Sequence, residues 1–237
     1  MIDAGLGIRA FFTTRDGGAS RAPYDSLNVA VHVGDEPADV AVNRARVADL
    51  AGVPVTFLVA EHGIRVGAVT SPGQDAPTAD ALVTTVRGAA LAAIAADCVP
   101  VLMHDAATGA VAAVHAGREG VHGGVIDAAV ARLLDLRGGW RARGAMSASI
   151  GPAACGRCYE VPAEMRARVA ARHPTAFSHT RRGTPALDLP RAVEARLDQL
   201  GFTHIVRRPE CTIESAQLFS HRREGVTGRF AGVIVCE

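Results

Sequence analysis

Three apolar segments close together in the sequence constrain the fold of this 237-residue chain more than any other feature. They are Ala89–Ala96, Val99–Met103 and Ala110–Val114, and alanine and β-branched residues dominate them. Each has the length of a strand and falls well short of the roughly 18 residues that a membrane span needs. The segments therefore predict buried β-strands.

Further strands and several helices are predicted around these segments. Val125, Ala129 and Leu133 recur at helical spacing and predict a helix over Val121–Leu136. The other predicted helices are Ala38–Ala51, Pro162–Arg172 and Pro190–Leu200, and the other predicted strands are Ile8–Thr14, Val55–Ala60, Ile64–Thr70, Ala81–Thr85, Ala145–Ile150, Thr203–Arg207 and Arg229–Val235. Because the chain shows no internal repeat or linker, we predict one α/β domain over residues 1–237.

The composition excludes several classes of function. The net charge is +1, charged residues make up 21 % and aromatic residues 4 %, so we expect neither nucleic acid nor a membrane as the main partner. All 25 basic side chains are arginine. The absence of lysine excludes Schiff-base chemistry and a Walker-A phosphate loop.

The cysteines and the N-terminal segment predict the compartment. The first residues lack a basic stretch followed by an apolar one, so we expect no secretory signal. Five cysteines are an odd number, and they are scattered along the chain. Both features favour a reduced, cytoplasmic protein, which we expect to be a monomer or a small homo-oligomer.

Three residues with metal-binding side chains follow predicted strands. His62 comes after Val55–Ala60, Cys98 after Ala89–Ala96, and His115 directly after Val114. Ligands gather at the carboxyl ends of neighbouring strands in α/β sheets. Two imidazoles and one thiolate suit zinc, and three protein ligands leave the fourth position that catalytic zinc sites keep open.

The residues alone leave other interpretations open. The spacing of the three residues matches no compact zinc signature, and a single Cys or His at a strand end can be merely packed or hydrogen-bonded. Cys155 and Cys158 form a CxxC motif that could be redox-active, metal-binding or neither. Cys211 and Cys236 are predicted to be core residues.

An ordered set of motifs spans nearly the whole chain and resembles the YfiH/YlmD family of laccase-domain proteins. Members of this family have been described as polyphenol oxidases and as purine nucleoside phosphorylases. The matching motifs are Thr13–Ser20, Tyr24–Asn28, His32–Asp35, Asn43–Arg44, Asp80–Thr84, Ala96–Pro100, Val114–Gly117, Ile150–Pro152, Tyr159–Val161, Phe219–Arg223 and Thr227–Arg229.

The resemblance implies a fold and a metal. It implies a layered α/β sandwich with mixed sheets, similar to the catalytic domain of cytotoxic necrotizing factor toxins. The family's zinc ligands correspond to His62, Cys98 and His115, so the resemblance implies a Zn²⁺ cofactor, with copper the less favoured metal.

The resemblance also implies an activity. The substrates would be adenosine, inosine, guanosine and methylthioadenosine, which phosphate would cleave, and adenosine would also be deaminated by zinc-activated water. For substrate binding we predict Arg15, Asn28, Arg44 and Arg222. The acid/base candidates, chosen by position, are Glu61, Asp97 and Glu160.

Two departures from the family pattern affect substrate contacts. Ala60-Glu61 precedes the first ligand, where the family commonly has Gln and another residue before His-Gly. Arg118-Glu119 follows Gly117, where the family often has Trp-Arg. We expect metal binding to survive both changes, and Arg118 could replace the lost positive charge.

The sequence leaves three alternatives to the purine activity. Copper-dependent phenol oxidation would need closely spaced histidines, and the nine histidines contain no His-x-His pair. Without a metal, Cys98 could act as a nucleophile with His115 as its base in a hydrolase or deamidase. The altered motifs are also consistent with a non-catalytic partner protein that has a decayed site.

Overall fold

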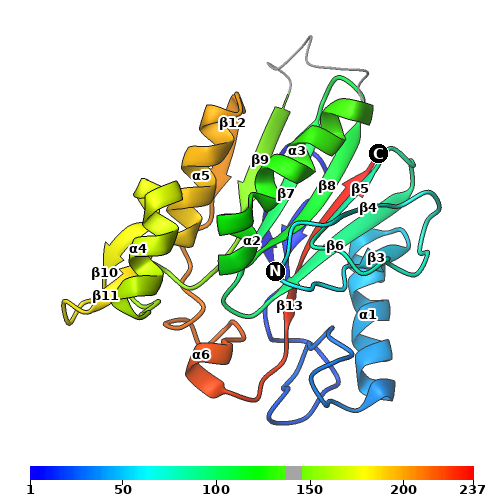
Figure 1. The fold of residues 1–237 in the computed structure, drawn as a ribbon. Helices are drawn as coiled ribbons and strands as arrows, with labels where there is room; N and C mark the ends of the chain where they lie inside the picture. Colours follow the sequence, from blue (N-terminus) through cyan, green and yellow to red (C-terminus); the bar gives the residue numbers. More distant parts are fainter. Residues whose placement is uncertain (137–145) are drawn as a thin grey trace.

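The computed structural model describes residues 1–136 and 146–237, which form two mixed sheets and one short hairpin (Figure 1). The five-stranded sheet has the order β1 (Ile2–Asp3), β2 (Ala10–Phe12), β13 (Phe230–Cys236), β6 (Ala89–Ala95), β3 (Val55–Phe57). The six-stranded sheet has the order β12 (His204–Arg207), β9 (Met146–Ile150), β7 (Val99–Asp105), β8 (Ala110–Ala116), β5 (Ala81–Thr84), β4 (Val66–Ala68). Of the predicted strand Ala145–Ile150, Ala145 lies outside the described residues.

The two sheets pack face to face, and this explains the continuous apolar runs of the sequence. In β6, Leu91 and Ala93 point into the layer between the sheets, whereas Ala90 and Ala92 point to the opposite face, which is also buried. The strand is therefore buried on both sides, a position that selects for uninterrupted apolar residues. Strands β7 and β8 belong to the other sheet and have the same double burial.

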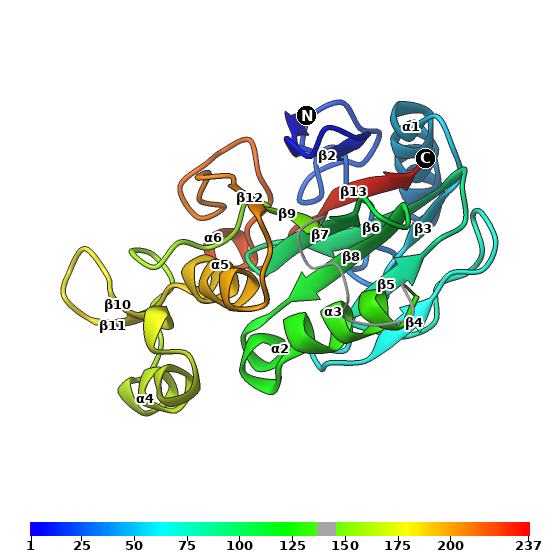
Figure 2. The ribbon, with the colours of Figure 1, turned by 90° about the horizontal axis from the view of Figure 1, so that it is seen from above.

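Helices cover the outer faces of both sheets. Helix α1 (Pro37–Ala51) packs against the five-stranded sheet, and α3 (Val125–Leu136) packs against the six-stranded sheet (Figure 2). Helix α5 (Leu189–Gln199) covers the β9–β12 end of the same outer face. The layers are thus helix, sheet, sheet and helix, which confirms the predicted α/β sandwich with mixed sheets.

The predicted helix Val121–Leu136 is wrong as one continuous element. The structure has α2 (Arg118–Gly123) followed by α3, and Gly124 between them has a φ of 98°. A left-handed residue ends a helix, and glycine adopts that conformation without steric cost. The apolar spacing continued across the break and concealed it.

The remaining elements lie beside the β12 edge. Helix α4 (Ala163–Arg172), the short 3₁₀ turn η2 (Pro174–Ala176) and the hairpin of β10 (Phe177–His179) and β11 (Pro185–Leu187) project from the body (Figure 1). The short helix α6 (His221–Glu224) precedes β13. Within the described residues, no helix has the length and apolar character needed to cross a membrane.

Candidate active site

His115 lies inside strand β8 and is almost completely buried, with 4 % of its surface exposed. Its backbone N–H donates to the Asp80 carbonyl at 2.8 Å, and its Nδ1 lies 4.0 Å from Asp80 Oδ1. The buried Asp80 carboxylate also accepts the N–H of Glu61 at 3.0 Å. Asp80 therefore links His115 to the segment that carries His62.

His62 lies in the loop that leads from β3 to β4 and has a φ of 63°. Few residues other than glycine adopt this left-handed conformation, so a specific turn holds the imidazole in place. The His62 and His115 rings meet edge to face, with centroids 4.7 Å apart and an interplanar angle of 87°.

Cys98 lies where the chain crosses from β6 in one sheet to β7 in the other. The preceding residue, Asp97, has a φ of 102° and makes the sharp turn that the crossing requires. We expected the three candidate ligands at the carboxyl ends of neighbouring strands, but they come from both sheets. The three residues converge at one end of the sandwich.

The donor atoms of His62, Cys98 and His115 lie within 4.8 Å of one another, so this group could hold a metal ion. Gly117 provides the space beside it. A Cβ on Gly117 would lie 3.1 Å from His62 Cδ2 and 3.3 Å from Cys98 Sγ, which is tighter than ordinary contact. A side chain at position 117 would thus press on the donor cluster.

Cys98 and His115 form an electrostatically coupled pair. Burial alone would raise the pKa of the Cys98 thiol, but the charge of His115 and hydrogen bonds from both histidines lower that pKa to about 6. Burial alone would lower the pKa of His115, but the Cys98 thiolate and the Asp80 carboxylate raise it to about 9. Near neutral pH the sulfur is therefore a thiolate, the form that binds metals and attacks electrophiles.

The donor cluster opens into a cavity of about 230 Å³. Two arginines, Arg222 and Arg229, give the cavity positive charge, and Tyr159 gives it an aromatic wall. The complete lining is His32, Ala60, His62, Ile94, Ala95, Ala96, Asp97, Cys98, His115, Tyr159, His221, Arg222 and Arg229. The cavity can therefore accept a small anionic or partly aromatic molecule beside the donor cluster.

Of the four predicted substrate-binding residues, the structure places Arg222 in this cavity. The Arg222 guanidinium lies 5.1 Å from the Tyr159 ring and donates to the Glu160 carbonyl at 3.0 Å. Asn28 is fully buried and bonds Ala30 and Asp35.

The other two predicted arginines make contacts elsewhere. Arg44 donates to the Val29 carbonyl and lies over the Phe57 ring. Arg15 pairs with Glu224 at 2.7 Å and with Asp25 at 3.3 Å. Arg15 and Asn28 thus connect the N-terminal loop to the C-terminal loop that forms part of the cavity.

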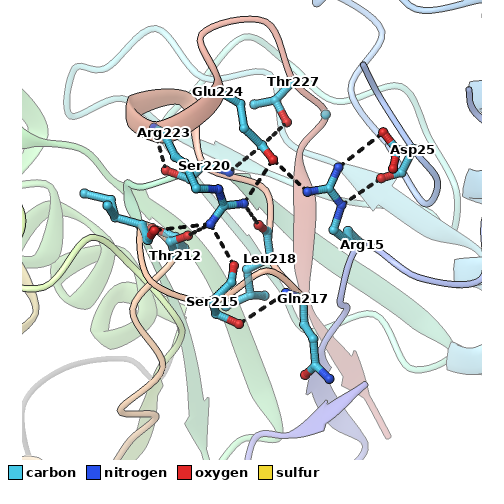
Figure 3. Close-up of polar contacts among 12 residues, drawn as sticks. Arg15, Asp25, Thr212, Ser215, Gln217, Leu218, Ser220, Arg223, Glu224 and Thr227 are labelled. Carbon is cyan, nitrogen blue, oxygen red and sulfur yellow. Dashed lines mark hydrogen bonds and ion pairs between the residues drawn. The ribbon is translucent and has the colours of Figure 1, made fainter. Parts of the chain in front are cut away.

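Figure 3 shows the polar contacts that fix the C-terminal loop. The Glu224 carboxylate lies between the guanidinium groups of Arg15 and Arg223, and Thr227 also donates to it. Arg223 in turn donates to the carbonyls of Thr212, Ser215 and Leu218. This network orders the loop that presents His221 and Arg222 to the cavity.

Asp97 is the one acid/base candidate of the three that lines the cavity. Both of its carboxylate oxygens accept hydrogen bonds, Oδ1 from Thr212 and Ser220, and Oδ2 from the Arg222 N–H. Glu61 pairs with the exposed Arg65, and Glu160 is exposed at the edge of a neighbouring groove.

Arg118 and Glu119, the second departure from the family pattern, lie at the start of α2. The Glu119 carboxylate pairs with both Arg118 and Arg168. The positive charge of Arg118 is thus partly neutralised by its own neighbour.

Four cavity residues with polar or aromatic side chains were not among the predicted site residues, namely His32, Tyr159, His221 and Arg229. All four lie within the family-like motifs, so those motifs were the available signal. Their convergence depends on contacts between distant segments, which no local pattern reveals.

Comparison with known proteins gives consistent matches over the whole chain. Residues 9–237 match the family model described as "Multi-copper polyphenol oxidoreductase laccase". A purine nucleoside phosphorylase of Streptomyces coelicolor is 48 % identical over 228 residues, which cover 94 % of this chain and 93 % of that protein.

Two solved structures share the fold. The structure of YlmD from Geobacillus stearothermophilus has a TM-score of 0.85 and 33 % identity, over 96 % of this chain and 91 % of that one. The YfiH structure from Bacillus licheniformis has a TM-score of 0.86 and 29 % identity, over 96 % and 92 %.

Proposed function

We propose that this chain, which belongs to the family described as "Multi-copper polyphenol oxidoreductase laccase", is a zinc-dependent purine nucleoside phosphorylase. Relatives of the chain carry the name purine nucleoside phosphorylase. The observation that carries the proposal is the shared cavity. Three metal-binding side chains and two arginines, Arg222 and Arg229, line the same 230 Å³ space. A phosphorylase needs to hold phosphate and a nucleoside together, and this cavity offers charge for the first and an aromatic wall for the second.

The donor set fits zinc. Two imidazoles and one thiolate match the ligand types of catalytic zinc sites, and three protein ligands leave one position open. Asp80 beside His115 is the kind of carboxylate that orients a metal-binding imidazole. When bound by His62, Cys98 and His115, zinc would supply Lewis acidity at the cavity floor.

Multicopper chemistry is less favoured by the donor groups. A multicopper oxidase needs several metal centres rich in histidine. Across residues 1–136 and 146–237, His62 and His115 are the histidines that belong to a metal-binding group. The family name therefore does not decide the metal, and we propose zinc.

Arg222 and Arg229 would bind phosphate through charge-assisted hydrogen bonds. A phosphate oxygen attacks C1′ of the ribose, the bond from C1′ to the purine nitrogen breaks, and its electron pair leaves with the base, which then takes up a proton. The products are the free purine and ribose 1-phosphate. Tyr159 would pack against the nucleoside, and the arginines would orient the attacking oxygen.

We also propose that the same cavity deaminates adenosine. Water replaces the 6-amino group, which leaves as ammonia, and inosine remains. His32 is a suitable proton carrier because burial and the charges of Arg229 and Arg44 lower its pKa, which keeps the imidazole neutral. Adenosine, inosine, guanosine and methylthioadenosine are the proposed substrates for phosphorolysis.

The test is a product assay. Purified protein is incubated with adenosine, with and without phosphate, and the products are separated by chromatography. We expect adenine only with phosphate and inosine in both cases, and we expect Cys98→Ala to abolish both products. Cys236→Ala, which removes a thiol far from the cavity, is the matched control. If none of the four nucleosides gives a product with the wild-type protein, the purine proposal is wrong.

One observation favours a second candidate, a metal-free cysteine hydrolase. Cys98, His115 and Asp80 provide a nucleophile, a base and an orienting carboxylate, the three kinds of group that thiol hydrolases use. Alkylation distinguishes the two candidates. A thiolate that binds zinc should be protected from iodoacetamide by added zinc and become reactive with a chelator, whereas a catalytic nucleophile should react rapidly in the isolated protein.

A further inference from the structure

A second group of metal-binding side chains lies outside the active-site cavity, at the end of two adjacent strands. Cys155 and Cys158 follow strand β9, and Cys211 and Glu214 follow strand β12. Strands β9 and β12 are parallel neighbours, so their carboxyl ends meet at the same edge. An isolated parallel bridge between Ala153 and Cys211 continues the pairing beyond the strands and holds the two loops together.

The two loops form similar tight turns. In the first, the N–H groups of Cys158 and Tyr159 donate to the Cys155 carbonyl, both at 2.9 Å. In the second, the N–H groups of Glu214 and Ser215 donate to the Cys211 carbonyl at 3.2 Å and 2.9 Å. Each turn places its first and fourth residues on one side. The sequence spacing is C-x-x-C in one turn and C-x-x-E in the other.

The four side chains converge on one point. Their donor atoms all lie within 4.8 Å of one another, and Cys158 Sγ is 3.1 Å from Glu214 Oε1. The Cys155 N–H points at Cys211 Sγ at 3.4 Å, a contact that stabilises a thiolate. We propose that Cys155, Cys158, Cys211 and Glu214 form a second metal site, which binds zinc with all four protein donors.

The donor number indicates a structural rather than a catalytic ion. Closed sites with four protein ligands, most of them sulfur, are typical of structural zinc. Arg181 lies 2.6 Å from Glu214 Oε1 and offsets part of the negative charge that three thiolates and a carboxylate would create. Cys155 and Cys158 are half-buried and Glu214 is exposed, so an ion can enter from solvent.

The position of the site gives the ion a role. Tyr159, next to Cys158, lines the active-site cavity, and Thr212, next to Cys211, donates to Asp97 at 2.6 Å. An ion that clamps the two turns would hold both residues in place. The second site would thus stabilise the cavity wall without contacting the substrate.

Metal content measured in the full-length Cys98→Ala protein tests this proposal independently of any activity. That variant lacks a ligand of the first site, so zinc that remains belongs elsewhere. We expect about one tightly held zinc per chain in Cys98→Ala, and a value near zero when Cys158→Ser is added. Cys236→Ser in the same background is the matched control and should retain the zinc. If folded Cys98→Ala protein retains no zinc after it has been incubated with zinc, the proposal is overturned.

A milder variant keeps the test informative if Cys158→Ser fails to fold. Glu214→Gln keeps the three thiols and removes the charged oxygen donor. We expect zinc transfer to a chelator to be at least about tenfold faster than in Cys98→Ala, and unchanged in the exposed control Glu164→Gln. An unchanged rate of zinc transfer in Glu214→Gln would contradict the proposed role of Glu214 as a ligand.

Thiol reactivity in the same Cys98→Ala background separates a metal from a disulfide. Zinc-bound thiols should become reactive when a chelator is added. If Cys155 and Cys158 instead react only after reduction, they form a redox pair and the metal proposal fails.

Discussion

The Asp97 carboxylate accepts a hydrogen bond from the Ser220 hydroxyl at 2.7 Å, although 123 residues separate them in the sequence. Asp97 immediately precedes Cys98, and Ser220 begins the short helix that carries Arg222. The same carboxylate also accepts the Arg222 N–H at 2.6 Å. The Asp97 carboxylate thus fixes Cys98, a candidate metal ligand, relative to the arginine that we propose for phosphate binding.

Replacing Asp97 by asparagine should loosen this connection. Asparagine tolerates the positive φ of position 97 but lacks the charge and one of the two acceptor oxygens. We expect Asp97→Asn to lose about 1–3 kcal/mol of unfolding free energy, with a further loss of activity. Urea denaturation measures the first effect. The exposed Asp49→Asn should stay within about 0.5 kcal/mol of wild type, and an equal loss there would contradict the assignment.

Gly117→Ala should weaken metal binding while the protein still folds. Gly117 has a φ of −74°, which alanine adopts freely, so the effect comes from the new methyl group and not from the backbone. That group would lie 3.1–3.4 Å from atoms of all three donor residues. We expect zinc release to accelerate at least about tenfold, measured by transfer to a coloured chelator. Wild-type release kinetics in Gly117→Ala would mean that the donor cluster does not bind the ion.

Arg222→Gln and Arg229→Gln should raise the KM for phosphate more than the KM for the nucleoside. Each substitution removes a charge-assisted hydrogen bond worth about 1.5–3 kcal/mol, so an increase of roughly tenfold or more is expected. Initial rates at varied phosphate and fixed inosine give the value. Arg65→Gln, which alters an exposed arginine, is the control. If both variants keep the wild-type phosphate KM, phosphate binds elsewhere.

Glu224 should make stability depend on acidic pH. Burial opposes its ionisation, but hydrogen bonds from Thr227, Arg15 and Arg223 outweigh burial and hold its pKa at about 2, below the ordinary 4.5. The native state therefore gains stability above pH 4.5, and this gain disappears as the pH falls toward 2.

Glu224→Gln isolates that contribution. At pH 7 we expect the variant to be about 1–3 kcal/mol less stable than wild type, with the difference shrinking between about pH 4.5 and 2. Chemical denaturation at several pH values measures it. A difference that is the same at pH 3 and pH 7 would show that the carboxylate charge is not responsible.

Local sequence pattern predicted the central strands well, because burial on both faces leaves a continuous apolar run such as Ala89–Ala96. It failed at Gly124, where a single left-handed residue divides a helix whose apolar spacing continues. From the same pattern we expected the three candidate metal ligands to lie along one sheet, but they come from both sheets. Whether Cys98 lies on a crossing between sheets depends on strand pairing, which sequence spacing does not encode.

The cavity residues show the same limit. Arg222 was among the predicted substrate-binding residues, but Arg229 and His32 reach the cavity only because β13 pairs with β6 and the N-terminal loop folds against it. Arg15 and Asn28 matched family motifs, and the structure gives both of them structural contacts instead. Cys155 and Cys158 become part of a candidate metal site only because the parallel pairing of β9 and β12 brings Cys211 beside them.

The most direct test of the central claim is a zinc titration of metal-free protein, followed by phosphate-dependent release of hypoxanthine from inosine. If His62, Cys98 and His115 hold a catalytic zinc ion, the rate should be negligible without metal and should rise to a plateau as the site fills. The plateau should be absent in Cys98→Ala. A rate that is already maximal in metal-free protein, or that falls as zinc is added, would contradict the account.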